Sequence, residues 1–236
     1  MRRAIFLAVS RQNILKAYQD QEPIEMSRWM SSASPFATPM ADMEKIPGYR
    51  PDKTQDITDA KKLLADAGYA NGFGPIELVT ADAAWAQQIM GPAYEQELRK
   101  NLNITSKTTI VQRALLAENY SKGTFDILVE TKFDCPISDP TPMWNAYLRT
   151  GASQNVDKYS NPEFDKMLDQ INAEMDTAKR QDLFNKGMDM LDQNPPFLIT
   201  GFTLHSHLLN SYIKGLSIEK WKHANWGRLD TAWLDK

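Results

Sequence analysis

Acidic and aromatic side chains follow two segments that are predicted to be strands. The segments are Ile76 to Thr80 (IELVT) and Phe125 to Glu130 (FDILVE), both rich in the branched and aromatic residues that favour strands. The side chains predicted to contact a ligand are Asp82 and Trp85 after the first strand, and Phe133, Asp134, Ile137 and Asp139 after the second. Ligands of α/β proteins bind beyond the carboxyl ends of strands, so these residues form the candidate site.

The chemistry of these residues suits a positively charged ligand. Asp82 and Asp134 supply two carboxylates, and Trp85, Phe133 and Trp144 are the nearby aromatic residues. A cation gains both from charge pairing and from contact with the faces of aromatic rings. We therefore predict a small-molecule or peptide-like ligand with an exposed positive group, bound without a cofactor.

The same residues also have structural interpretations. Asp139 can cap the helix that is predicted over 142–148 (PMWNAYL). Trp144 lies in that helix at the spacing of a core residue. Asp82 and Asp134 can be solvated carboxylates of loops. The sequence leaves these alternatives open.

A histidine pair provides the enzymatic alternative. His205 and His207 share one face of an extended segment and could ligate a metal ion, as in a metal-dependent hydrolase. No acidic or cysteine third ligand stands at a recognisable spacing. The sequence also has no G-x-S-x-G elbow, no glycine-rich phosphate loop and no H-E-x-x-H helix. Binding is therefore favoured over catalysis.

The elements that must position the site alternate between strand and helix. Strands are predicted over 76–80, 104–111 and 125–130, with a further extended segment over 197–207. Helices are predicted over 2–9, 11–18, 60–67 (capped by Asp59 and ended by Gly68), about 85–102 (kinked at Gly91 and Pro92) and 112–122 (ended by Gly123). This alternation predicts an α/β fold with a mostly parallel sheet between helices.

Residues 158–193 predict a hairpin of two amphipathic helices. Asn161 caps the first helix and Pro162 occupies its first turn, while Asp176 or Thr177 begins the second. The apolar stripes are Phe164, Met167, Leu168, Ile171 and Met175 on the first helix, and Leu183, Phe184, Gly187, Met188 and Leu191 on the second. The sequence Asn-Pro-Pro at 194–196 ends the hairpin, which must pack its stripes on other parts of the protein.

Composition narrows the possible classes of protein. The chain has 236 residues, of which 42% are hydrophobic, and a net charge of −3 without a basic stripe, so a nucleic-acid partner is not predicted. One cysteine, Cys135, excludes an internal disulfide. No apolar run approaches the roughly 20 residues that span a bilayer. The start, MRRAIFLAVSRQ, has too short an apolar stretch for a signal peptide and reads as the first turns of a helix.

The segment 19–57 is rich in proline and has little periodicity. It nevertheless carries large apolar side chains, namely Met26, Trp29, Met30, Phe36, Met40 and Met43. A structureless loop of this length is uncommon inside a compact domain. We therefore expect it to run over a surface supplied by something else.

Five segments in this order resemble one protein family: RRAIFLAVSRQNIL, DAKKLLADAGY, ENYSKGTFDILVE, SDPTPMWNAYLRTG and the hairpin sequence from Lys158 onward. They resemble the extracellular solute-binding proteins of peptide and nickel ABC importers, family 5. This resemblance implies a receptor with two α/β lobes that closes around its ligand, works with membrane permease subunits and resides in the periplasm or another extracytoplasmic space.

The resemblance also implies that this chain is a carboxyl-terminal part, a type II periplasmic-binding-protein-like second lobe. Residues 1–18 would be hinge-proximal helices, 19–57 a segment facing the missing first lobe, 58–203 the α/β lobe, and 204–236 a return segment belonging to that first lobe. Trp29 would then touch ligand or dock on the missing lobe. A lobe without its counterpart exposes apolar surface, so a nontransport interaction module is a further alternative.

Two departures from the family pattern concern the ligand. Peptide-binding relatives carry a D-x-x-D-P motif whose first aspartate holds the ligand's amino group. Aligned on Asp139 and Pro140, that position is Pro136 here. A basic residue that some relatives use to hold a carboxylate is replaced by Asp82. The resemblance therefore leaves recognition of a peptide amino terminus in doubt.

Overall fold

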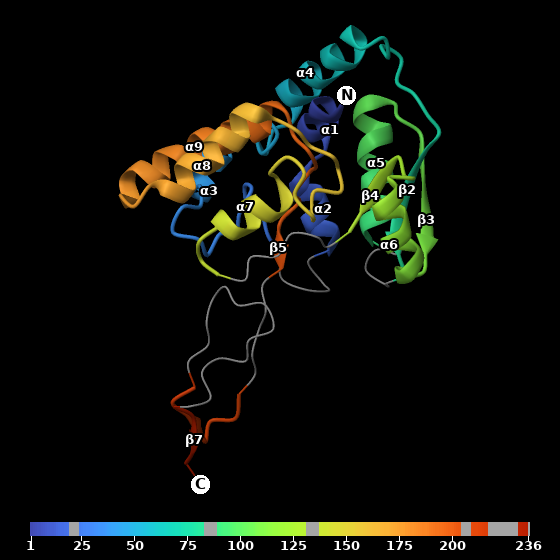
Figure 1. Cartoon of the computed structure of the whole chain (residues 1–236). Coiled ribbons are helices and arrows are strands. Elements are labelled where there is room, and N and C mark those ends of the chain that lie inside the picture. The colour runs from blue at the N-terminus through green and yellow to red at the C-terminus, as the bar shows by residue number, and fades with distance from the viewer. Residues whose placement is uncertain (19–23, 83–88, 131–136, 204–208, 217–230, 236) are drawn as a thin grey trace.

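A three-stranded parallel sheet forms one end of the molecule (Figure 1). The structure is a computed structural model that describes residues 1–18, 24–82, 89–130, 137–203, 209–216 and 231–235. The strands are β2 (Ile76–Ala81), β3 (Ser106–Val111) and β4 (Ile127–Val129), in the order β3-β2-β4. All three predicted strands and their parallel pairing are confirmed, although β3 and β4 are shorter than expected.

Helices cover both faces of this sheet. Helix α5 (Gly91–Leu102) follows β2, and helix α6 (Arg113–Lys122) follows β3. Leu78 belongs to the main core together with Leu98 and Leu102 of α5, whereas its neighbour Val79 packs in a smaller cluster with Leu116 of α6. Successive residues of a strand face opposite sides, so one strand supplies both clusters.

Helix α5 begins at Gly91, directly after residues 89–90 in π-helical conformation, so the helical geometry changes at the position of the predicted interruption. Pro92 stands in the first turn of the helix, where its missing N–H costs no hydrogen bond. Residues 85–88 of the predicted helix lie outside the described residues. Gly123 ends α6 with a φ of +65°, as predicted.

The first helices pack against the sheet layer. Helices α1 (Arg2–Ala8) and α2 (Arg11–Tyr18) agree with prediction, and α1 contacts α4 (Thr54–Asp66) and α5. The cap predicted at Asp59 is wrong, because α4 begins five residues earlier. Asp52 Oδ1 accepts hydrogen bonds from the backbone N–H and the hydroxyl of Thr54, at 2.9 and 2.6 Å, and so supports the first turn.

The helical hairpin forms as predicted. Its helices are α8 (Pro162–Ala173) and α9 (Thr177–Gln193). Asn161 accepts from the N–H groups of Glu163 and Phe164, and Asp176 accepts from that of Lys179. Met175, expected in the apolar stripe, is 91% exposed because α8 ends before it.

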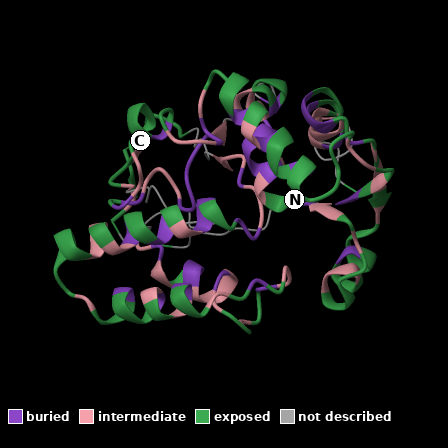
Figure 2. Cartoon of the chain, turned by 90° about the horizontal axis from the view of Figure 1, so that it is seen from above, coloured by how far each residue is buried: buried purple, intermediate pink, exposed green. Residues whose placement is uncertain are grey.

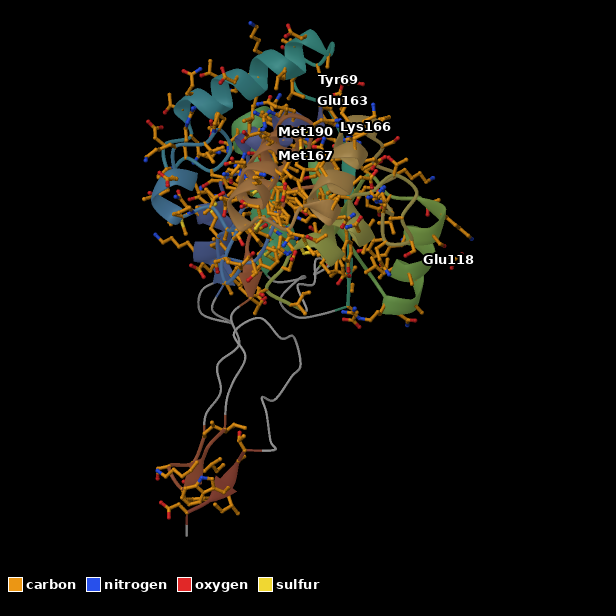
Figure 3. All side chains as sticks on the ribbon, turned by 60° about the vertical axis from the view of Figure 1, so that its left-hand side comes forward. Tyr69, Glu118, Glu163, Lys166, Met167 and Met190 are labelled. Atoms are coloured by element: carbon orange, nitrogen blue, oxygen red, sulfur yellow. The ribbon has the colours of Figure 1, made fainter. Side chains whose placement is uncertain are left out.

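The two faces of the hairpin differ in their exposure. The hairpin helices carry both buried and exposed residues along their length (Figure 2). Glu163 and Lys166 of α8 are exposed, whereas Met167 of α8 and Met190 of α9 pack partly buried against the core (Figure 3). The buried side rests on α7 (Thr141–Tyr147), where the Trp144 ring meets the Phe164 and Phe184 rings.

The described part of the proline-rich segment, 24–57, is built into this chain. It contains β1 (Ile24–Glu25) and α3 (Met40–Met43). Five of its six large apolar side chains are buried, namely Met26, Trp29, Met30, Phe36 and Met43. The expectation that these side chains form a surface for another lobe is therefore corrected: they belong to the main core, and only Met40, 40% exposed, remains outward.

The carboxyl-terminal residues form short antiparallel pairs. Strand β5 (Phe202–Thr203) pairs with β1, and β6 (Ile213–Lys214) pairs with β7 (Trp233–Leu234). The β6–β7 hairpin lies apart from the main body (Figure 1). The described residues thus form an α/β fold with one three-stranded parallel sheet and two short antiparallel strand pairs. Within the described chain, none of the helices has the length and apolar character needed to cross a membrane.

Candidate functional site

The carboxyl edge of the sheet is a point where the chain changes direction. From the central strand β2 the chain passes to β3 on one side and then to β4 on the other. Such a switch point leaves a crevice beyond the strand ends, because the connecting helices lie on opposite faces. Asp82 lies at this edge, exposed, and its N–H donates to Val111 O of β3 at 2.8 Å.

The structure adds Glu130 to the residues predicted at this edge. Thr80 pairs with Val129, so Glu130 follows directly beside Ala81. Its side chain is only 7% exposed, and its Oε1 lies 3.9 Å from Arg113 Nη1. Glu130 is the last residue of the predicted strand FDILVE. The sequence therefore already indicated that Glu130 lies at the end of a strand.

The electrostatics of this edge are acidic. Burial raises the pKa of the Tyr120 hydroxyl, and the nearby carboxylates of Glu130 and Asp157 raise it further. Both carboxylates thus act on the same side chain of α6. With Asp82 beside β3, the described part of the edge presents carboxylates on two neighbouring strand ends. Arg113 at the start of α6 offsets one of these charges, because it lies 3.9 Å from Glu130 Oε1, so the excess of negative charge that favours a cation is small.

Three predicted site residues, Trp85, Phe133 and Asp134, lie outside the described residues, as do His205 and His207. The structure therefore neither assembles nor separates them. Within the described part of the chain, no three His, Cys, Asp or Glu side chains gather as metal ligands would. Ile137 is described and is 44% exposed, on the segment that leads into α7.

Asp139 has structural partners for both of its carboxylate oxygens. Oδ1 accepts from the N–H of Thr141 at 2.9 Å, and Oδ2 accepts from Arg180 Nη1 at 2.9 Å. The first bond is the capping role that the sequence offered as the alternative to ligand contact. The structure thus places Asp139 at the start of α7 with its charge paired to α9.

This pairing predicts a pH dependence of stability. Burial raises the pKa of the Asp139 carboxyl, but the hydrogen bonds from Arg180 and Thr141 outweigh burial and hold the pKa below 3.8, its ordinary value. The ionised group therefore stabilises the folded state above pH 3.8, and this contribution is lost as the pH falls through the folded pKa. We expect Asp139→Asn to lower the free energy of unfolding by about 1 kcal/mol at pH 7.

Urea denaturation of the wild type and of Asp139→Asn at several pH values measures this contribution. The difference between the two proteins should shrink steadily as the pH is lowered below 3.8. A difference that stays constant from neutral to acidic pH would show that the charge of Asp139 contributes nothing.

Trp29 and Trp144 are core residues in this structure. Both side chains are 0% exposed. Trp144 Nε1 donates to Trp29 O at 2.8 Å, and Trp29 Nε1 donates to Asp192 Oδ1 at 2.6 Å. Neither ring reaches solvent, so the structure agrees with the core interpretation of Trp144 and gives Trp29 the same role.

The described chain also contains a cavity of about 330 Å³ away from the carboxyl ends of the strands. It lies between the carboxyl-terminal parts of α4 and α5 and is lined by polar residues that include Lys61, Asn71, Lys100 and Asn103. Leu102 and Asn103 lead into β3, so this cavity opens at the amino edge of the sheet. It is not part of the candidate site.

The sheet and its two helical layers define an α/β protein with a switch point at the carboxyl edge of the sheet, where proteins of this class bind ligands. The chain belongs to the bacterial extracellular solute-binding proteins, family 5, whose middle region matches residues 1–154. Curated relatives of this chain are named as oligopeptide-binding and dipeptide-binding proteins.

Individual relatives are similar at low identity. The periplasmic oligopeptide-binding protein OppA of Escherichia coli K12 is 23% identical over 66% of this chain and 28% of its own length. The nickel-binding protein NikA of Staphylococcus aureus is 24% identical over 84% of this chain and 40% of its own. The structure of Burkholderia pseudomallei OppA superposes with a TM-score of 0.76 at 19% identity, covering all of this chain and 45% of that one. The chain therefore spans less than half the length of these relatives.

Proposed function

We propose that this chain is the second lobe of the solute-binding component of an ABC importer, and that the carboxyl edge of the sheet forms its side of the ligand cleft. The observation that carries the proposal is the acidic switch point, where Asp82 and Glu130 follow neighbouring parallel strands. Membership of a family of solute-binding proteins supports it. Hinge closure over the ligand would then present a closed form to permease subunits outside the cytoplasm.

In this proposal the chain corresponds to one lobe of a two-lobed receptor, which agrees with the share of the relatives that it covers. The fold matches the whole of this chain but 45% of the Burkholderia protein. In this proposal α1 and α2 lie near the hinge, and the return segment 204–236 belongs to the first lobe. Its described hairpin supports this assignment, because Trp233 and Leu234 are 55% and 58% exposed. Large apolar side chains left so exposed favour a partner surface.

The ligand is proposed to be a peptide-like or cationic small molecule. OppA is named for oligopeptides and NikA for nickel, so relatives of this chain bind different solutes. The acidic edge favours a positive group, and Trp85, Phe133, Asp134 and Ile137 would complete the contacts from the loops after β2 and β4. Pro136 stands where the family's aspartate would hold a ligand amino group. We therefore propose Asp82 and Asp134 as the residues that pair with the positive group of the ligand.

Thermal denaturation in the presence of probe ligands tests this function. We expect lysyl-alanine amide, a cationic dipeptide, to raise the melting temperature, because a ligand that binds only the folded state stabilises it by about 2.7 kcal/mol at 100 times its Kd. Succinyl-alanine, an anionic probe, should have no effect. Asp82→Asn should reduce the shift, whereas Glu118→Gln, on the exposed face of α6, should leave it unchanged.

Two outcomes would contradict the proposal. Stabilisation by the anionic probe alone would overturn the predicted charge preference. Nanomolar affinity in residues 1–236 alone would contradict the proposal that a second lobe completes the site, because a one-walled cleft cannot enclose a small molecule. Weak binding that requires millimolar probe is the expected result.

A further inference from the structure

Arg180 reaches from the first turn of α9 to the segment that leads out of the β4 loop. Its Nη1 donates to Asp139 Oδ2 at 2.9 Å, and its Nη2 donates to Thr141 Oγ1 at 2.8 Å. These partners lie 41 and 39 residues earlier in the chain. One guanidinium thus fixes two points of the described segment 137–141.

The guanidinium is itself held in place by the core. Its central carbon lies 5.2 Å from the centre of the Phe36 ring and 5.6 Å from that of Phe184. Cation–π contacts of this kind fix the direction of the side chain. The side chain of Arg180 is 18% exposed, so little solvent competes with its two hydrogen bonds.

The geometry of the contact favours arginine over lysine. The planar fork of a guanidinium can donate to two acceptors at once, whereas an ammonium is a compact charge without that fixed geometry. Arg180 Nε is buried and has no hydrogen-bond partner among the described residues. Both of the hydrogen bonds made by Arg180 therefore go to the segment 137–141. The buried Nε–H group, which has no partner among the described residues, costs desolvation free energy.

We propose that Arg180 is a positioning residue, which sets the place of the segment 137–141 and thereby of Ile137 at the ligand site. The ligand role of Ile137 rests on the proposed function, but the positioning itself does not. Asp139 receives Arg180 on one oxygen and the N–H of Thr141 on the other, so the same carboxylate links α9 to the start of α7. The hairpin α8–α9 thus fixes one margin of the site without contacting ligand.

A spin label on the segment tests the positioning without any ligand. The chain has one cysteine, so Cys135→Ser combined with Ile137→Cys leaves a single thiol at a position that is 44% exposed in the wild type. Electron paramagnetic resonance then measures the motion of the label. In this background we expect Arg180→Gln to shorten the label's correlation time by at least about twofold, because the segment gains local freedom.

Further variants separate positioning from general stability. Asp139→Asn should have a similar effect, and the double variant should add little to either change, because both remove the same contact. Arg180→Lys should restore only part of the immobilisation. The matched control is Arg149→Gln, which removes a 2.6 Å ion pair with Asp169 of α8 at the other end of α7. It should leave the spectrum unchanged.

Urea denaturation of the same variants completes the test. An unchanged spectrum in folded Arg180→Gln, or an equal change in Arg149→Gln at equal stability, would overturn the proposal. If Arg180→Gln does not fold, Thr141→Val and Asp139→Asn supply the same test, and an unchanged spectrum in both would overturn it. The spin-label experiment contains no ligand. Its outcome therefore does not depend on whether the cationic probe binds, and the two proposals can fail separately.

Discussion

Replacing Asp192 with alanine is expected to lower the free energy of unfolding by about 3–5 kcal/mol, because it leaves a buried guanidinium without its principal partner. Arg28 donates to Asp192 Oδ2 from Nε at 2.8 Å and from Nη2 at 2.6 Å. The exposed fractions of the two side chains are 5% and 4%. Burial lowers the pKa of Arg28, but Asp192 and Asp189 outweigh burial and raise it, so the guanidinium stays charged.

The same carboxylate also orders Trp29. Trp29 Nε1 donates to Asp192 Oδ1 at 2.6 Å, and the backbone of Trp29 has a φ of +53°. A bulky residue in this left-handed region is strained and persists only where its surroundings fix it. Loss of Asp192 would therefore remove the hydrogen bond that holds the Trp29 ring and leave Arg28 with the exposed Asp189 as its ion-pair partner on α9.

Asp189 provides a matched control on the same helix. Its Oδ1 also lies 2.6 Å from Arg28 Nη2, but its side chain is 71% exposed. We expect Asp189→Ala to cost at most about 1 kcal/mol, as an exposed ion pair does. Urea denaturation followed by circular dichroism compares the two variants. Equal losses for Asp189→Ala and Asp192→Ala would refute the view that burial decides the value of this pair.

Trp144→Ala is expected to cost about 3–5 kcal/mol of unfolding free energy, because it opens a large cavity in the core. The ring lies 5.2 Å from that of Phe184, and its Nε1 donates to Trp29 O at 2.8 Å. A Cβ added at Gly187 would lie 2.7 Å from Trp144 Cζ3, so α9 approaches the ring closely at this glycine. The substitution thus removes packing, a hydrogen bond and the surface on which the hairpin rests.

Trp233→Ala is the control for this prediction. Trp233 is 55% exposed on the β6–β7 hairpin, so its loss should change stability by less than about 0.5 kcal/mol. Chemical denaturation of both variants at neutral pH measures the difference. A small effect of Trp144→Ala would mean that the ring is not part of the core and would reopen its interpretation as a ligand platform.

Local sequence patterns were sufficient to predict those helices and strands that are set by residues close together in the chain. The caps at Asn161 and Asp176 and the apolar stripes between them predicted both hairpin helices, because a cap acts within three residues and a stripe repeats every turn. The same holds for the three parallel strands and for Gly123. The Asp59 cap failed because Asp52 and Thr54 formed a competing start upstream.

Contacts between distant residues decided what the local patterns could not. Arg28 and Asp192 are 164 residues apart, and Arg180 and Asp139 are 41 apart, so neither pair leaves a periodic trace in the sequence. The first pair draws an irregular segment into the core, and the second gives Asp139 a structural partner. The sequence determined the longer helices, the three parallel strands and the family of this protein. Only the tertiary structure decided which apolar and charged side chains would be buried together, because burial depends on partners that meet when the chain folds.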